Sequence, residues 1–362
     1  MHKRVFILLV FLILAVSPAR SQDSLWDSVF HPDSLQRLIN LLAADSLNGR
    51  LAGSDGAVAA AGFIADEFRQ AGLVALNRSN DFLLPINPSW FNVAGMIKGR
   101  SRPGQVVIFM AHYDHIGTVG TNPFPDLSKD DNRVPVSEDD IFNGANDNAS
   151  GVAALIGLAR YYHSLTGNER SLIFLAVTGS EFGPWGSEHF VDHFQNDSIC
   201  AVINMDMIGS FTPLSKPFFT DGYSRELQTI LNKNLYNADP VKYGRQYFLY
   251  NSKAEIDTKR LTPLQKNFLA GKDFKGVDAW INSRNQCQNV NAKSFARNHV
   301  PVVSISSTYV NDKYYHHVKD EPFRIDYTMM GEVIRAIVTG TAGIISGQNT
   351  PDHKLVSKTD RY

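Results

Sequence analysis

Four short runs of apolar residues, rich in β-branched side chains, stand out along the chain. Strands that are covered on both faces have continuous apolar runs of this kind, whereas strands with one wet face alternate apolar and polar residues. The runs therefore predict buried strands of a mainly parallel sheet. They comprise residues 106–111, 172–177, 201–205 and 302–305.

Longer segments with a helical pattern lie between and around these runs. One of them ends at Gly72, a residue that suits the C-terminal cap of a helix. Strands that alternate with helices are typical of α/β proteins. We therefore expect one α/β domain in which helices flank a mixed, mainly parallel sheet on both faces. The predicted helices cover residues 35–42, 56–71, 152–162 and 331–345.

The N-terminus has the pattern of a secretory signal peptide. A positively charged start is followed by an unbroken apolar stretch at residues 5–16 and by small residues at Ala19 and Ser21. A membrane anchor is the competing interpretation, but it needs about 18 apolar residues. We expect residues 1–21 to be removed and residues 22–362 to form the domain. The mature protein would then be secreted or periplasmic, without stable insertion in a membrane.

Composition and charge are those of an ordinary globular protein. Hydrophobic residues make up 43% of the chain and the formal net charge is −1, which suits a large core. No basic block is present, so nothing in the sequence indicates nucleic-acid binding. Cys200 and Cys287 are too few for a disulfide framework, and either one disulfide or two buried thiols fits them. No feature specifies an oligomeric state.

Two segments do not fit regular elements. Residues 118–143 form a long loop with six carboxylates. Loops of this length are often lids or binding loops, although a solvated surface loop is the simpler interpretation. Residues 243–299 are polar and include Trp280. They suit either an insertion that covers the sheet edge as a lid, or an ordinary peripheral helix and hairpin.

Five residues that can bind metal lie at the ends of predicted strands or at the start of a helix. Taken singly, each is more simply a helix cap, a turn carboxylate or a hydrogen-bonded histidine. In open α/β sheets, however, ligands bind outside the carboxyl ends of the strands, so these side chains would meet at one rim. Two imidazoles and three carboxylates suit a pair of zinc ions that share one bridging carboxylate. The five are His112, Asp147, Glu181, Asp206 and His316.

Two further carboxylates are expected to support the histidines. Asp114 lies two residues after His112, and Asp320 lies four residues after His316. A carboxylate that accepts a hydrogen bond from an imidazole N–H fixes the orientation of a metal-bound histidine. Asp147 is expected to open a helix, whose N-terminus favours an ionised carboxylate. That position suits a bridging ligand.

The segments around these residues resemble the co-catalytic zinc aminopeptidases, peptidase family twenty-eight of the metallo class. This family also contains carboxypeptidases and glutaminyl cyclases. The similarity begins at LNGRLAGS, residues 47–54, and continues through NVAG, residues 92–95, to YHHVKDEP, residues 315–322. It implies a zinc-peptidase-like, phosphorylase/hydrolase-like fold and a peptide as substrate or ligand.

The resemblance also implies how the metal ligands are divided. It assigns His112 and Asp206 to one zinc ion, Glu181 and His316 to a second ion, and Asp147 to both. In the family, the two ions activate a shared hydroxide that attacks the scissile carbonyl. All five ligand types are present in this chain.

The chain departs from the family pattern at the general base. Relatives read Glu-Glu-x-Gly-Leu-x-Gly-Ser, where the first Glu takes a proton from the attacking water. Here residues 180–187 read SEFGPWGS, so Glu181 aligns with the ligand and Ser180 stands at the base position. A serine hydroxyl does not accept that proton near neutral pH, and general acid–base catalysis is worth roughly 100- to 10,000-fold. Glu188 and the acidic loop offer other carboxylates that could replace the base.

A second departure precedes Phe295. Relatives often carry Ser-Asp-His at the positions of Val290, Asn291 and Ala292, in a segment near the active site. The chemistry of the substrate pocket is therefore expected to differ from that of relatives. Tyr315, in contrast, matches the family pattern.

Three functions remain open. The first is a secreted zinc-dependent metallopeptidase, an aminopeptidase that acts on short peptides. The second is a catalytically impaired, metal-binding pseudo-peptidase that recognises peptides or peptidoglycan fragments without cleaving them. The third is a glutaminyl cyclase-like enzyme. The DNASG segment, residues 147–151, follows the peptidase version of the bridging motif, which favours the first function over the third.

Overall fold

The computed structural model of the protein describes residues 17–77, 81–122, 139–195, 198–211, 216–249, 289–308 and 314–356. The predicted signal peptide lies outside these ranges up to residue 16, and residues 17–21 open helix α2 (Ser17–Phe30). Cys200 is buried. Cys287 and Trp280 lie outside the described residues, so a disulfide stays a prediction. Four carboxylates of the acidic loop also lie outside the described residues, namely Asp126, Asp130, Asp131 and Glu138.

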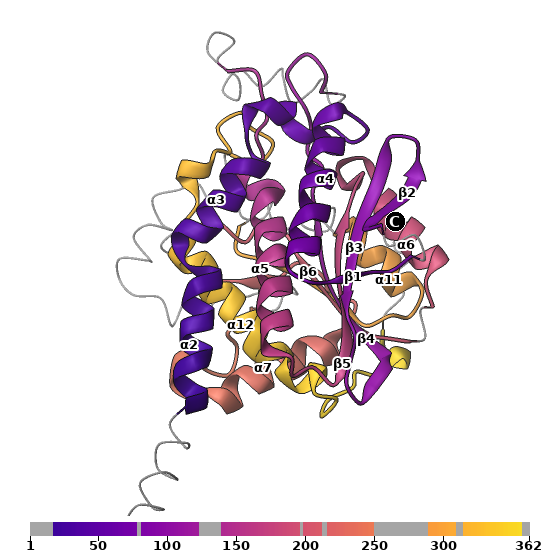
Figure 1. The fold of residues 1–362 in the computed structure, drawn as a ribbon. Coiled ribbons are helices and arrows are strands. Elements are labelled where there is room, and N and C mark those ends of the chain that lie inside the picture. The colour runs from indigo at the N-terminus through magenta and orange to yellow at the C-terminus, as the bar shows by residue number, and fades with distance from the viewer. Residues whose placement is uncertain are drawn as a thin grey trace, which may run out of the picture.

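A mixed sheet forms the centre of the described chain (Figure 1). Its eight strands follow the order β1-β3-β5-β4-β6-β8-β7, with β2 paired beside β3. Strands β4, β5, β6 and β8 run parallel and contain the four apolar runs, which confirms the predicted sheet. The strands are β1 (Val74–Ala75), β2 (Leu83–Asn87), β3 (Trp90–Ile97), β4 (Arg102–His112), β5 (Arg170–Val177), β6 (Ile199–Met205), β7 (Phe218–Phe219) and β8 (Val302–Ser306).

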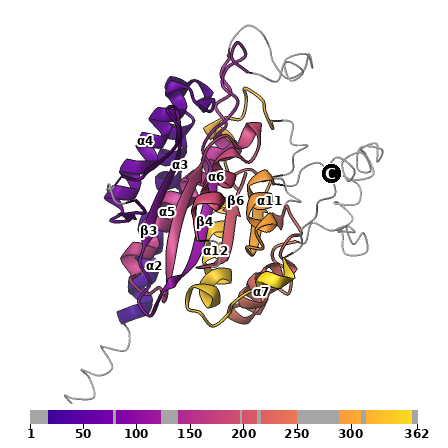
Figure 2. The same ribbon diagram turned by 90° about the vertical axis from the view of Figure 1, so that its right-hand side faces the viewer.

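Helices cover both faces of this sheet, as predicted (Figure 2). Helices α4, α5 and α12 pack on one face, and α6 and α11 pack on the other. Helix α2 lies against α5, and α7 lies beside α12. The helices are α3 (Pro32–Leu42), α4 (Asp55–Gln70), α5 (Ser150–Leu165), α6 (Trp185–His193), α7 (Arg225–Ala238), α8 (Pro240–Tyr243), α11 (Val290–Arg297) and α12 (Tyr327–Ile345).

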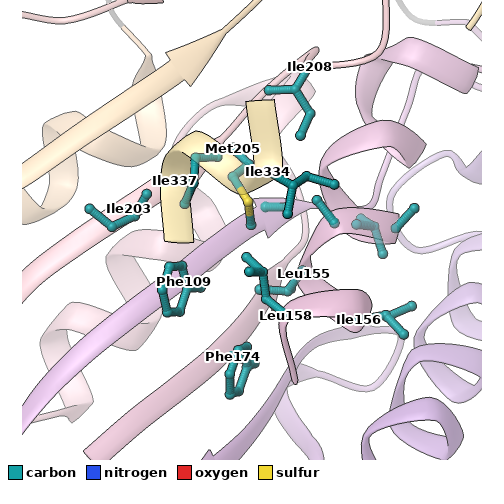
Figure 3. Close-up of a cluster of buried hydrophobic side chains, with 14 of the residues drawn as sticks. Phe109, Leu155, Ile156, Leu158, Phe174, Ile203, Met205, Ile208, Ile334 and Ile337 are labelled. Atoms are coloured by element: carbon teal, nitrogen blue, oxygen red, sulfur yellow. The ribbon is translucent and has the colours of Figure 1, made fainter. Parts of the chain in front are cut away.

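The apolar runs form strands because their side chains are buried on both faces. In β4, Val107 and Phe109 face the layer of α5, whereas Ile108 and Met110 face the layer of α6. Figure 3 shows the first layer, in which Phe109 stacks on Phe174 with ring centroids 5.7 Å apart. Burial of a side chain of this size contributes about 1.5–3 kcal/mol. The strands, and the residues that follow them, are therefore held firmly in place.

The C-terminal helix α12 belongs to this core. It is long and apolar enough to cross a membrane by length and composition, but 56% of its most apolar window is buried inside the fold. It packs against α7 and α3. The four predicted helices are thus present, as α3, α4, α5 and α12, with bounds shifted by a few residues.

The end of the predicted insertion, residues 243–299, packs into the body of the fold. Ala292, Phe295 and Ala296 of α11 are buried against the face of the sheet that α6 also covers. Their spacing is that of an apolar helix stripe. Helix α11 is therefore not part of a lid. Residues 250–288 lie outside the described chain, so a lid formed by residues before α11 stays a prediction.

Candidate metal centre

The five candidate ligands meet at the carboxyl edge of the parallel strands. His112 is the last residue of β4, and Asp206 directly follows β6. Glu181 follows β5 in a short 3₁₀ turn (Ser180–Phe182). His316 lies beyond the end of β8. Because parallel strands end at the same edge of a sheet, residues far apart in the sequence converge here.

Asp147 lies at the centre, with one carboxylate oxygen toward each half of the cluster. Oδ1 is 3.4 Å from Nε2 of His112, and Oδ2 is 3.4 Å from Nε2 of His316. Oδ1 of Asp206 is 3.6 Å from Nε2 of His112, and Oε2 of Glu181 is 2.9 Å from Nε2 of His316. The cluster thus consists of two groups of ligand atoms, each within 4.8 Å of one another, that share Asp147.

His115 joins the cluster, although the sequence offers little to mark it. Its side chain is fully buried, and its Nδ1 lies 3.1 Å from Oε1 of Glu181 and 3.8 Å from Oδ2 of Asp147. It lies three residues beyond the end of β4 and forms an isolated β-bridge with Leu51, in which its backbone N–H donates to the carbonyl of Arg50 at 3.1 Å. The second group therefore contains two histidines, His115 and His316.

Two carboxylates of the cluster, Asp147 and Glu181, are held in their ionised forms. Burial alone raises the pKa of Asp147, but interactions with His112 and His316 outweigh burial and hold it well below its usual value. Burial and the charge of Asp147 raise the pKa of Glu181, yet His316 and His115 lower it to about 2. Both groups therefore carry negative charge near neutral pH.

The pKa values of the two ligand histidines, in contrast, are raised. Burial lowers the pKa of His316, but Glu181 and Asp147 raise it to about 10. Burial likewise lowers the pKa of His112, and Asp114, Asp147 and Asp206 together raise it well above its usual value. Without metal, protons on these imidazoles supply the positive charge that the buried carboxylates require.

This chemistry fits a divalent cation such as zinc. Oδ2 of Asp147 is buried and receives no hydrogen bond of normal geometry from the described residues. Imidazole nitrogens and carboxylate oxygens are zinc ligands, and they bind in their deprotonated forms. A cation in each group of ligand atoms would replace the imidazole protons and satisfy the carboxylates. The clustered charges would be costly to bury without one.

Asp114 supports both halves of the cluster, but not in the expected way. The Nδ1 of His112 is 3.1 Å from the backbone carbonyl oxygen of Asp114 and 3.7 Å from its carboxylate. The carbonyl is therefore the nearer partner of the imidazole. The carboxylate instead accepts a hydrogen bond from the backbone N–H of Glu181, at 3.2 Å.

Asp320 supports the bridging ligand rather than His316, which corrects the sequence-based expectation. Its two carboxylate oxygens accept hydrogen bonds from the backbone N–H groups of Asn146 and Asp147, at 2.9 and 3.0 Å. Burial raises the pKa of Asp320 to about 7, against these two hydrogen bonds. Asp320 thereby holds the loop that presents Asp147.

The expectation that Asp147 opens a helix is also wrong. Its backbone dihedral angles are φ −109° and ψ 89°, and α5 begins three residues later, at Ser150. The loop is held by its neighbours instead: the guanidinium of Arg50, buried and 1% exposed, donates to the carbonyls of Asn143 and Gly144. The same guanidinium donates to the carbonyl of Tyr113, which joins this loop to the end of β4.

The base position carries no charge. The hydroxyl of Ser180 donates to Oδ1 of Asn291 at 3.1 Å, and Asn291 is 1% exposed. The two departures from the family pattern are therefore in direct contact. Glu188 pairs with Arg297 at 3.2 Å, and both side chains are about half exposed, so this carboxylate is engaged at the surface.

A family model described as Peptidase family M28 matches residues 92–341. Among curated proteins, a probable zinc metalloprotease of Phaeosphaeria nodorum is 28% identical over 130 residues. That alignment covers 35% of this chain and 25% of the relative, so the chain matches about a quarter of the relative's length.

Solved structures with the same fold carry more than one activity. The LapA aminopeptidase of Legionella pneumophila superposes with a TM-score of 0.61 at 16% identity, covering 91% of this chain and 76% of that one. A glutaminyl cyclase of Porphyromonas gingivalis superposes with a TM-score of 0.57 at 15% identity, covering 88% and 99%. At these identities the likeness establishes the fold alone.

Proposed function

The chain belongs to peptidase family M28, and from this premise we propose that it is a secreted, zinc-dependent aminopeptidase acting on short peptides, with slow catalysis. The observation that carries the proposal is the position of Asp147, whose two oxygens face the two ligand groups. A shared carboxylate of this kind suits two zinc ions. Secretion rests on the N-terminal signal pattern.

Each ligand has a defined task in this proposal. His112 and Asp206 would hold one ion, Glu181 and His316 would hold the other, and Asp147 would be shared. When bound, zinc polarises a water molecule and the peptide carbonyl. The carbonyl of Asp114 orients His112, and His115 orients Glu181 through its hydrogen bond.

The substrate needs space beside the cluster. A hollow adjoins it, lined by Asn146, Met207 and Tyr315 among others. Tyr315 stacks on His316 with ring centroids 3.9 Å apart, which places an aromatic wall next to a ligand. The hollow itself has room for about one water molecule. We therefore propose that the N-terminal residue of a peptide docks against this aromatic wall rather than inside the hollow.

The proton transfer is the weak step. Ser180 donates its hydroxyl hydrogen to Asn291, and neither side chain accepts a proton near neutral pH. Without a carboxylate here, the rate should fall by roughly 100- to 10,000-fold below that of an enzyme with a general base. The proposal is therefore a zinc peptidase with low turnover.

The proposal is tested by peptide hydrolysis. The zinc-loaded protein is incubated with a broad panel of short peptides, including one with an N-terminal glutamine, and the products are identified by mass spectrometry. We expect slow release of N-terminal residues that stops with a chelator and returns with zinc. Cyclisation of the glutaminyl peptide without hydrolysis of the others would refute the peptidase.

The Ser180–Asn291 hydrogen bond favours a second candidate, a pseudo-peptidase that binds peptides without cleaving them. A neutral pair at the base position supplies no proton acceptor, and it would leave metal binding and peptide docking unaffected. Titration calorimetry of the zinc-loaded protein with the same peptides separates the two candidates. Binding of peptides that stay intact over long incubation supports the pseudo-peptidase, and measurable turnover excludes it.

A further inference from the structure

The first turn of α11 contacts the metal cluster through an asparagine that precedes the helix. Asn289 is the N-cap of α11: its Oδ1 accepts hydrogen bonds from the backbone N–H groups of Asn291 and Ala292, both at 3.1 Å. Its Nδ2 donates to Oδ2 of Asp206. One side chain thus joins a helix terminus to a metal ligand.

The orientation of this carboxamide is fixed by its partners. Oxygen and nitrogen of an asparagine are distinguished by their hydrogen-bond partners. Two backbone donors face Oδ1 of Asn289, so that atom must be the acceptor. The amide NH₂ is thereby directed at Asp206, whose other oxygen, Oδ1, faces His112.

Asp206 is the most exposed of the three carboxylate ligands. Its side chain is 19% exposed, against 7% for Glu181 and 3% for Asp147. Glu181 is held from two sides, by His115 and through its backbone by Asp114. In the described part of the chain, Asn289 is the one residue whose amide or hydroxyl group donates to the carboxylate of Asp206.

Helix α11 is itself anchored, so Asn289 has a fixed support. The hydroxyl groups of Ser294 and Ser187 lie 2.9 Å apart, which joins α11 to α6. Phe295 is fully buried in the core between the sheet and these helices. The cap residue of such a helix cannot move without disturbing this packing.

We propose that Asn289 is a positioning residue of the metal centre. Its carboxamide orients Asp206 and thereby strengthens the binding of the ion at His112 and Asp206. The inference rests on the proposed function in assuming that the cluster binds zinc. It goes further in predicting that the two ion sites respond differently to one substitution.

Two variants separate positioning from capping. In Asn289→Ser the hydroxyl still caps the helix but is too short to reach Asp206, whereas Asn289→Ala removes both functions. Asn298→Ser is the matched control, because Asn298 lies at the other end of α11 and donates to the carbonyl of Ser294. Metal-free preparations of the parent and the three variants are titrated with Zn²⁺ by calorimetry and with Co²⁺ by absorption spectroscopy.

The expected result is selective. In Asn289→Ser, one zinc affinity falls by about 10- to 100-fold, as for other residues that orient a metal ligand, and the second is unchanged. The cobalt spectrum changes for the same site. The melting temperature of the metal-free protein stays at the parental value in Asn289→Ser and falls in Asn289→Ala, while Asn298→Ser binds zinc as the parent does.

Other outcomes overturn the inference. If Asn289→Ser keeps the parental affinities, or if both affinities fall equally, Asn289 does not position Asp206. If the parent binds one ion, that affinity must fall in Asn289→Ser for the inference to stand. A parent that binds no zinc refutes the proposed function itself, a result distinct from an unaffected variant of a zinc-binding parent.

Discussion

The ligand cluster and the base position are adjacent in the chain, yet they differ in charge. Glu181 lies among buried ionised groups, and its carboxylate faces His115 and His316. Ser180, one residue earlier, forms a neutral hydrogen bond with Asn291. The described residues thus bring together two groups of cation ligands, while the side chain at the base position is neutral. These two tasks are separable in this fold.

The largest effect on the charged region is expected from Asp147→Asn. The carboxamide keeps the shape of the side chain but removes the charge that both ligand groups share. Zinc affinity should fall for both ions by more than about 100-fold, since even residues that only orient a ligand are worth 10- to 100-fold. Titration of the metal-free variant with Zn²⁺ measures both affinities. One ion still bound at parental affinity would show that Asp147 does not bridge.

A smaller effect is expected from Asp320→Asn. This variant retains one acceptor for the backbone N–H groups of Asn146 and Asp147, and loses the other. Zinc affinity should fall by about 10- to 100-fold through displacement of Asp147. The control is Asp326→Ala, which removes the N-cap of α12 and should cost about 1 kcal/mol in stability with zinc affinity unchanged. Equal zinc affinities in both variants would refute the role of Asp320.

Zinc binding should release protons near neutral pH. The pKa of His112 is well above its usual value, and that of His316 is about 10, so both imidazoles are protonated in the metal-free protein. Because zinc binds the deprotonated ring, about two protons should be released and affinity should rise with pH up to about 10. Calorimetry in buffers of different ionisation enthalpy measures the proton count. Zinc affinity that is independent of pH would contradict this assignment.

The raised pKa of His316 also makes the metal-free protein less stable as the pH rises. A pKa raised in the folded state contributes stability that is fully present below the unfolded value, near 6.5. For His316 this stability is lost as the pH rises through about 10. Thermal unfolding of the metal-free protein between pH 7 and 10 should therefore show a falling melting temperature, which zinc reverses.

The smallest effect concerns Glu188. This carboxylate pairs with Arg297 on the surface, where both side chains are about half exposed. Glu188→Gln should change stability by less than about 1 kcal/mol and leave peptide hydrolysis unchanged. Loss of hydrolysis in this variant would show that Glu188 supplies the missing base.

The sequence predicts the strands and the metal ligands of the site better than the residues that hold those ligands in place. Continuous apolar runs identify β4, β5, β6 and β8 because strands covered on both faces need apolar side chains throughout. The ligands follow from these strands, since His112, Glu181 and Asp206 lie at or just beyond strand ends.

The residues that hold the ligands in place could not be predicted from the sequence, because they join segments that are distant along the chain. Asp320 binds the backbone of the loop around Asp147 rather than its neighbour His316. Asn289 contacts Asp206 only because the apolar stripe of α11 packs on the sheet. His115 is placed by an isolated β-bridge to Leu51, which is distant in the sequence. Each depends on tertiary packing that local patterns do not specify.

The central claim is that the metal site is intact and the proton acceptor is missing. The direct test is kcat/KM for release of N-terminal residues by zinc-loaded parent, Ser180→Glu and Ser180→Gln proteins. The account predicts equal zinc binding in all three and a rise of roughly 100- to 10,000-fold in Ser180→Glu alone. A parent that hydrolyses peptides as fast as Ser180→Glu would contradict it.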